Sequence, residues 1–300
     1  MELPSGTEYD AILITGPTAS GKSALAVELA AKHRGEVVNA DSMQVYDTLH
    51  VLTARPSDAD MAGIPHHLYG TVPAGQAYST GAWLRDVSQV IDGIRARGHM
   101  PVLVGGTGLY FQALTGGLSE MPEISPDIRE KWRARLAEEG PERLHAELMR
   151  LDPRAAETLR PGDGQRIVRA HEVLDQSGRS ILDFQSRAGE AIVEPARAMK
   201  LIVLPDRAVL HDRINRRFEK MLDQGAVEEV QALIALGLDP RMPAMKAIGV
   251  PQIAAMLEGR LSRDEVIAQA SAATRQYAKR QMTWFRNRMD ESWQRIGAGD

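Results

Sequence analysis

The chain has 300 residues, no cysteine and a formal net charge of −4. This length is enough for one sizeable core or two unequal domains. The absence of cysteine excludes disulfides and thiolate metal sites. No apolar run approaches the roughly 20 residues that cross a bilayer, and Met1–Gly6 contains neither a basic region nor an apolar signal core. We therefore expect a cytoplasmic protein without membrane contact. The net charge alone does not indicate nucleic-acid binding, which depends on local basic patches.

A glycine-rich turn follows the first expected strand, residues 10–16, and precedes a helix-like run over 24–30. The turn consists of Gly16, Pro17, Thr18, Ala19, Ser20, Gly21, Lys22 and Ser23. This arrangement is typical of a P-loop, in which backbone N–H groups, a lysine ammonium and a metal-binding hydroxyl hold phosphates. We expect residues 16–23 to bind a diphosphate or triphosphate, with Ser23 ligating Mg²⁺. A turn that binds nothing is disfavoured because pattern, strand and helix agree.

Two further polar segments follow short apolar runs. Residues 36–39 and 101–104 are expected strands, followed by Asp41 and by a second glycine-rich loop with Thr107. Ligands of open parallel sheets lie beyond the carboxyl ends of the strands, so both residues should lie on the P-loop side. Aspartate is also a common turn residue, so its position alone leaves Asp41 open between a functional and a turn role.

His66 and His67 lie between these two strands. Adjacent histidines point in different directions on any regular element, so they make a poor metal pair. We favour one satisfied, buried histidine. The functional alternative is a contact with a phosphate or with the loop of Asp41.

Strand signals stop after about residue 118 and return at 200–204. We expect an α/β fold, a P-loop NTPase-like parallel sheet flanked by helices, with an all-helical insertion. The expected divisions are a first core part at 1–118, the insertion at 119–198 and the rest of the core with C-terminal helices at 199–300. Arg166 and Arg169 share one helix face in the insertion. That face is either a solvated basic surface or a polyanion contact.

Basic residues also gather on two later helices. Arg213 and Arg217 are four apart after the returning strand, so they can reach the P-loop ligand or simply face solvent. No acidic residue occurs between 274 and 288, where basic residues alternate with aromatic ones. This combination suits loop or single-stranded RNA, and also an ordinary amphipathic helix.

With these motifs together, the chain resembles the tRNA dimethylallyltransferase (isopentenyltransferase) family over nearly its whole length. The matching segments are residues 16–23, 41–46, 63–68, 105–110, 165–170, 213–221, 246–249 and 274–281. The combination is specific, although the P-loop alone is not. One departure is that Tyr69 and Gly70 stand where the family usually has an acidic residue.

The resemblance implies transfer of a dimethylallyl group from dimethylallyl diphosphate to the N6 amine of the adenine 3′ of a tRNA anticodon, releasing pyrophosphate. It implies Mg²⁺ as cofactor and Asp41, Thr107 and Arg217 as catalytic residues, with Asp41 the general base. The helical insertion would grip the anticodon stem-loop, and we expect a monomer. The implied tRNA contacts are Asp41, Ser42, Met43, Gln44, Thr107, Arg129, Gln165, Arg166, Ile167, Val168, Arg169, Lys246, Lys279 and Arg280.

Two other classes share part of the pattern. A P-loop small-molecule kinase would use ATP and an arginine-bearing lid, but it gives no reason for a large helical insertion or for the basic and aromatic tail helix. A non-catalytic RNA-binding ATPase would need a strand that ends in Asp and Glu, which the sequence lacks.

Overall fold

The computed structural model describes residues 9–186 and 189–297, which form two compact units. The first unit combines Met1–Thr115 with Ile192–Asp300, and the second is Gly116–Ala191. The expected insertion, 119–198, ends seven residues later than this second unit. The difference arises because Ile192 N and Val193 N both donate to Leu114 O, at 3.0 and 3.1 Å, within the first unit. No helix in the described ranges is long and apolar enough to cross a membrane.

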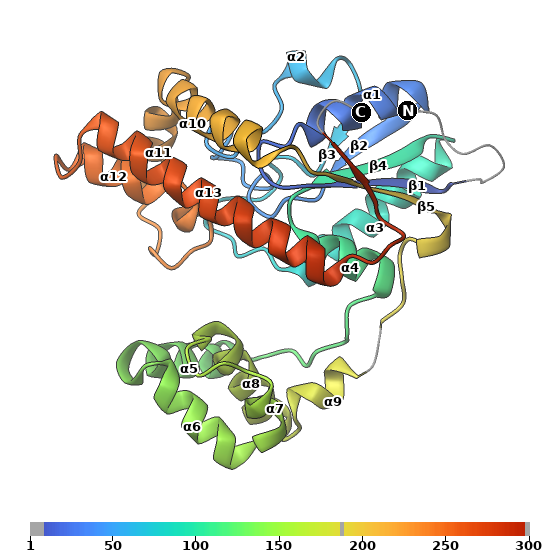
Figure 1. The fold of residues 1–300 in the computed structure, drawn as a ribbon. Helices are drawn as coiled ribbons and strands as arrows, with labels where there is room; N and C mark the ends of the chain where they lie inside the picture. Colours follow the sequence, from blue (N-terminus) through green and yellow to red (C-terminus); the bar gives the residue numbers. More distant parts are fainter. Residues whose placement is uncertain (1–8, 187–188, 298–300) are drawn as a thin grey trace. The chain divides into compact units, whose positions relative to one another are not determined.

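The first unit is built on a six-stranded sheet in the order β3-β2-β4-β1-β5-β6, in which all neighbouring strands are parallel. The strands are β1 (Ala11–Thr15), β2 (Gly35–Asn39), β3 (His66–His67), β4 (Met100–Gly105), β5 (Ala198–Val203) and β6 (Gln294–Ile296). The fold is therefore the expected α/β parallel sheet flanked by helices (Figure 1). The edge strands β3 and β6 were not predicted, because two or three residues are too few to show a period.

Helices cover both faces of the sheet, which explains why the central strands β1, β4 and β5 are mostly apolar. On one face, Leu13 and its neighbours pack against α3 (Thr80–Ala96) and α4 (Gly108–Gly116). On the other face, Ile12 and Ile14 pack against α1 (Lys22–Lys32). Figure 1 shows α1 on one side of the sheet and α3 and α4 on the other. This packing fixes the direction of β1 and thus the position of the loop that follows it.

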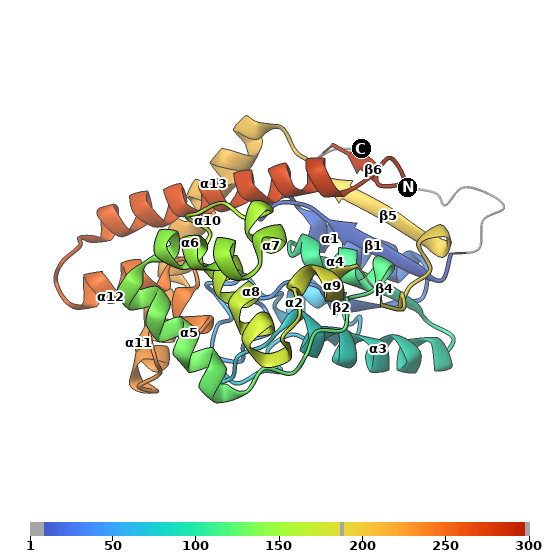
Figure 2. The ribbon, with the colours of Figure 1, turned by 90° about the horizontal axis from the view of Figure 1, so that it is seen from below.

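The C-terminal helices form a second core beside the sheet. They are α10 (Arg207–Asp223), α11 (Ala226–Ala235), α12 (Val250–Leu257) and α13 (Arg263–Arg288), joined by the short η2 (Ala244–Lys246). The short α2 (Asp58–Met61) and η1 (Pro195–Arg197) lie elsewhere in the unit. The apolar faces of the C-terminal helices pack against the segment 43–54 that follows β2. A capping box of Ser262 and Glu265 begins α13. Figures 1 and 2 both show α13 running beside α10.

The two adjacent histidines do point in different directions. His67 Nε2 lies 2.6 Å from Glu36 Oε2, and His66 Nδ1 lies 2.8 Å from Ile64 O. Glu36 is buried and also accepts from Arg97 Nε at 2.9 Å. The hydrogen bonds from Arg97, His99 and His67 lower the pKa of Glu36 to about 2, while burial opposes the decrease. His67 is thus a satisfied structural histidine, but its side chain is 28% exposed, so it is not the buried histidine that the sequence favoured.

The second unit is all-helical within its described residues. It contains α5 (Pro126–Glu139), α6 (Pro141–Leu151), α7 (Pro153–Glu157), α8 (Gly164–Ser177) and α9 (Ile181–Gln185). The first three begin at a proline, whose fixed φ and missing N–H suit the first helical position. Its core brings together apolar residues from all five helices and from the segment before α5.

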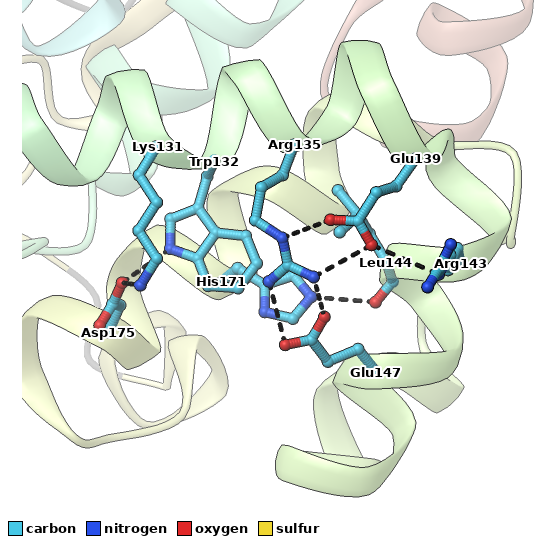
Figure 3. A network of polar contacts seen from close by, with 9 residues as sticks. All are labelled: Lys131, Trp132, Arg135, Glu139, Arg143, Leu144, Glu147, His171 and Asp175. Atoms are coloured by element: carbon cyan, nitrogen blue, oxygen red, sulfur yellow. Dashed lines mark hydrogen bonds and ion pairs between the residues drawn. The ribbon is translucent and has the colours of Figure 1, made fainter.

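A buried aromatic pair joins three helices of this unit (Figure 3). Trp132 of α5 stacks on His171 of α8 with ring centroids 4.0 Å apart. His171 Nε2 donates to Leu144 O of α6 at 2.9 Å, and burial lowers the histidine pKa, which keeps the ring neutral. Arg135 lies 4.8 Å from the centre of the Trp132 ring and donates to Glu139 and Glu147. This network fixes α8 and therefore the face that carries Arg166 and Arg169.

Candidate active site

The turn between β1 and α1 has the geometry that a P-loop needs. Gly21 adopts φ 96° at the N-cap of α1, a conformation that favours glycine. A Cβ at Gly16 would lie 2.6 Å from Val203 O, so the turn also requires close approach to β5. Lys22 Nζ donates to Pro17 O at 3.3 Å, across the turn. The loop therefore presents a helix N-terminus and a lysine ammonium on one side, which is an anion-binding arrangement.

A cavity of about 1260 Å³ opens over this turn. Residues 18–23 line it, together with Asp41, Gln44 and the side of α10. Its cationic side chains are Lys22, Arg55, Arg213, Arg216, Arg217 and Lys220, and its carboxylates are Asp41, Asp60 and Asp212. Cations outnumber carboxylates, so we expect the first cavity to attract a multivalent anion.

A second cavity of about 350 Å³ adjoins the first. Much of its wall is apolar, with contributions from Leu52, Ile214, Phe218, Met221, Ala247, Ile248 and Tyr277. Polar groups line it as well, among them Lys246, Thr274 and Arg280. Both cavities are lined by Thr18, Ala19, Asp41, Thr53, Arg217 and Met221. Asp41 and Arg217 therefore stand where an anion in one cavity would meet an apolar or flat group in the other.

Asp41 has the turn role that the sequence left open, and its position beside both cavities is compatible with the functional one. Its Oδ1 accepts from Met43 N at 2.9 Å, which is an aspartate turn. No hydrogen bond to Oδ2 is found among the described residues, and the carboxylate faces both cavities. Asn39 Oδ1 accepts from Asp41 N at 2.9 Å and so fixes the backbone. One carboxylate oxygen therefore orders the loop, and the other is available to a substrate.

Thr107 acts on this loop rather than on a cavity wall. Its Oγ1 accepts from Ser42 N at 3.0 Å, which ties the segment after β4 to the segment after β2. Ser42 in turn lines the second cavity. Thr107 thus lies at the expected edge of the sheet and holds the residue that follows Asp41.

Burial changes the proton affinity of the cations at the turn. It lowers the pKa of Lys22 to about 8, with Asp41 opposing the decrease and Arg217 adding to it. Burial also lowers the pKa of Arg217, and Asp41 again opposes this. The pKa of Tyr277 rises because of burial and the nearby Asp41, so its hydroxyl stays neutral. An anion bound here would favour the charged forms of Lys22 and Arg217 and so raise their pKa values again.

The other predicted site residues fall into two groups. Gln44 lines the first cavity, and Ser42, Met43, Lys246 and Arg280 line the second. Lys279 lies outside both, in a shallow groove on α13 with Trp284 and Arg288. In the helical unit, Arg129, Gln165 and Arg166 are exposed and Arg169 is partly so.

Ile167 and Val168 are placed differently from what the tRNA-contact prediction needs. Their side chains are buried in the helical unit with Trp132 and Leu144. Because 3.6 residues complete a helical turn, Arg166 and Arg169 face outward while the two residues between them face the core. Ile167 and Val168 therefore offer no side-chain surface to RNA, and their role is to hold α8.

Tyr69 lines the first cavity at the position where the sequence departs from the family. Burial and the nearby Asp41 raise its pKa, so it contributes a neutral hydroxyl where an acid is usual. Gly70 N donates to Gln44 O at 2.9 Å, which keeps this segment against the loop of Asp41.

Several lining residues carried no sequence signal. Leu52 and Thr53 come from the irregular segment after β2, held by Glu229, which accepts from the backbone N–H groups of residues 50–52. Phe218 is an ordinary core residue in its helix pattern. Gln281 lines neither cavity and occurs in a family segment without an evident role, although it contacts two site loops. Contacts between distant segments leave no periodicity that sequence reading could detect.

The donor set fits a metal that arrives with phosphates. No group of three or more His, Asp or Glu side chains among residues 9–186 and 189–297 is placed to hold an ion. Ser23, in the first turn of α1, lines the first cavity beside Lys22. Mg²⁺ commonly takes one or two protein oxygens and completes its shell with water and substrate phosphates. The Ser23 hydroxyl matches that use.

The pKa of Lys22 predicts how anion binding depends on pH. Because the pKa is lowered to about 8, the ammonium is present below that pH and is lost above it. The affinity for pyrophosphate should fall by up to about tenfold per pH unit above pH 8 through loss of one proton. Calorimetric titration of wild type and Lys22→Arg from pH 7 to 10 checks this. The ligand's own ionisation cancels in the affinity ratio, and a ratio independent of pH would contradict the prediction.

Comparisons with known proteins agree with this geometry. The family described as IPP transferase matches residues 44–288, and the family described as isopentenyl transferase matches residues 9–69. The tRNA dimethylallyltransferase of Agrobacterium fabrum is 68% identical over 288 residues, covering 96% of this chain and 97% of that protein. The enzyme of the same name from Rhizobium meliloti is 63% identical over 289 residues, covering 96% and 95%.

Solved structures give the same result. The tRNA isopentenylpyrophosphate transferase of Bacillus halodurans matches with a TM-score of 0.68 and 32% identity, covering 97% of this chain and 90% of that one. A eukaryotic dimethylallyltransferase acting on tRNA matches with a TM-score of 0.82 and 26% identity, covering 97% and 74%. A P-loop over a cationic cavity, an adjoining apolar cavity and a family match over most of the length together show that this chain belongs to the IPP transferase family of tRNA dimethylallyltransferases.

Proposed function

We propose that the protein transfers a dimethylallyl group from dimethylallyl diphosphate to the N6 amine of the adenine 3′ of a tRNA anticodon, releasing pyrophosphate. The observation that carries this proposal is the shared wall of the two cavities, where Asp41 and Arg217 lie. A group-transfer enzyme needs an anion site joined to an acceptor site at the reacting atom. A P-loop kinase reading accounts for the first cavity only and is not favoured.

The first cavity would bind the diphosphate and stabilise it as it leaves. Lys22, the N–H groups at the start of α1 and Arg217 surround the place where negative charge grows when the allylic C–O bond breaks. Arg213 donates to Ser20 O at 3.2 Å, so it supports the turn and also lines the cavity. We assign Ser23 to a divalent metal, Mg²⁺, which when bound neutralises charge on the departing pyrophosphate.

The second cavity would receive the adenine beside the allylic group. As the N6 lone pair forms the new C–N bond, the amine must lose one proton, and Asp41, which lines both cavities, would accept it through Oδ2. Thr107 positions Ser42 and so keeps Asp41 in place. The target base has to leave its stack to enter such a pocket, which single-stranded loop nucleotides do at low cost.

We place the tRNA contacts on basic and polar side chains of each unit that are exposed or, for Arg169, partly exposed. In the helical unit they are Arg129, Gln165, Arg166 and Arg169, and in the first unit they are Lys246, Lys279 and Arg280. Phosphate contacts of this kind position an RNA, and loop bases give the specificity. We assign the anticodon stem-loop to these surfaces. A monomer in the cytoplasm, where tRNA is modified, completes the proposal.

The proposed activity is tested with isotopically labelled dimethylallyl diphosphate and unmodified tRNA. Label should become attached to the tRNA, in the loop that contains the anticodon, and pyrophosphate should appear in equal amount. An ATP hydrolysis assay runs in parallel. Turnover of ATP to ADP with a small-molecule acceptor and no labelled tRNA would instead support the kinase.

Replacing Asp41 with asparagine tests the general base. The amide keeps the size and the turn hydrogen bond, but it accepts no proton, so the single-turnover rate should fall by about 10²–10⁴-fold. Affinity for dimethylallyl diphosphate should change little, which separates chemistry from binding. Single-turnover rates with pre-bound tRNA measure this. A full-rate variant would show that the proton leaves through pyrophosphate or water.

Salt dependence tests the helical unit as a tRNA contact. Each lost phosphate contact should lower the slope of log affinity against log salt by about one. We expect this for Arg166→Ala and Arg169→Ala, measured by filter binding from 50 to 300 mM salt. Arg150→Ala, exposed on α6 of the same unit, is the matched control. Slopes equal to that of the control would show that neither arginine contacts a tRNA phosphate.

A further inference from the structure

Gln281 bridges the two loops on which the site depends. It lies on α13 and is 6% exposed. Its Oε1 accepts from Thr18 N in the P-loop at 2.9 Å, and its Nε2 donates to Gly106 O after β4 at 2.9 Å. One side-chain amide from a third segment thus joins two loops that are far apart in the sequence.

The amide is the chemistry that this position requires. It meets one backbone donor and one backbone acceptor at once, which neither a carboxylate nor an ammonium can satisfy. The Thr18 N–H is already used by Gln281, so it is not among the N–H groups available to a phosphate. An unsatisfied backbone group at this depth would cost more than one ordinary hydrogen bond.

The loop after β4 is shaped around this side chain. A Cβ at Gly106 would lie 2.3 Å from Gln281 Nε2 and 3.3 Å from Asp41 Oδ2, so a larger residue here would displace the amide from its present place. The next residue, Thr107, holds Ser42 N. The Gln281 amide therefore contacts the loop whose Thr107 holds Ser42 beside Asp41, the proposed general base. Its oxygen contacts the P-loop.

The same face of α13 contacts the site along several turns. Tyr277, one turn before Gln281, lines the second cavity. The ring of Trp284, one turn after Gln281, packs against Gly108, where a Cβ would lie 2.2 Å from the ring. Residues at these spacings share a helix face. The helix is thus packed firmly on both sides of Gln281, which keeps the amide in one place.

From this geometry we infer that Gln281 is a positioning residue for group transfer. It sets the spacing between the loop that holds the leaving group and the loops that hold the base. The inference rests on the proposed function for its effect on rate, because misplacement by about 1 Å of reacting groups can cost about 10²-fold. Its effect on the P-loop stands separately and is measurable with pyrophosphate alone.

The test compares Gln281→Met with Gln276→Met, an exposed position on the same helix. Methionine keeps the length of the side chain and removes both hydrogen bonds. We expect pyrophosphate affinity to fall about 3–10-fold, and the single-turnover rate of prenyl transfer to fall about 10–100-fold. The thermal midpoint should fall, because Thr18 N and Gly106 O lose their partner, whereas tRNA affinity measured well below that midpoint should stay close to that of the control. Unchanged pyrophosphate affinity and rate, or losses matched by equally weakened tRNA binding, would overturn the inference.

The pH dependence of the Gln281→Glu rate tests the bridge, because a purely structural role of Gln281 would leave that dependence unchanged. An ionised carboxylate accepts from Thr18 N but repels Gly106 O, whereas the protonated acid can also donate to that carbonyl. The rate of this variant, divided by that of wild type, should therefore rise as pH falls from 7 to 5. A flat ratio would count against the bridge. If wild type transfers no prenyl group, the proposed function fails, and the pyrophosphate titrations still decide whether Gln281 positions the P-loop.

Discussion

Because all six strands of the sheet are parallel, the segments that follow β1, β2 and β4 leave from the same edge. β4 lies between the other two, and Ala40 N, directly after β2, donates to Val104 O of β4 at 2.8 Å. The P-loop, Asp41 and Thr107 therefore converge because of the strand directions. The helices on both faces keep the strands aligned, so the convergence depends on burial of the sheet.

The two adjoining cavities differ in charge and in the shape of ligand that they suit. The cationic cavity is costly to leave without an anion, since burial has already lowered the pKa values of Lys22 and Arg217. The apolar cavity has no such requirement and suits a flat or hydrocarbon group. Asp41 stabilises both cations and also faces the acceptor side. In the proposed reaction, this one carboxylate would link the electrostatics of the first cavity with proton removal in the second.

Local patterns determined much of the molecule. The P-loop, the strands at 36–39, 101–104 and 200–204, and the helical character of the insertion are set by residues close in the chain, whose periodicity and turn chemistry act without distant partners. The placement of Asp41 and Thr107 at the ligand edge followed from a general property of parallel sheets. The assignments of both residues, of Arg217 and of the tRNA contacts came from the family resemblance and stay predictions.

Other features were decided only when distant segments met. The strands β3 and β6 are too short to form alone and exist because a longer strand supplies their hydrogen bonds. Ile167 and Val168 were grouped with Arg166 by motif, yet helix geometry turned them into the core. The second cavity, the Glu229 anchor and the Gln281 bridge combine residues separated by many positions in the chain. A sequence specifies such contacts only through the free energy of the whole packed fold, so no local pattern reveals them.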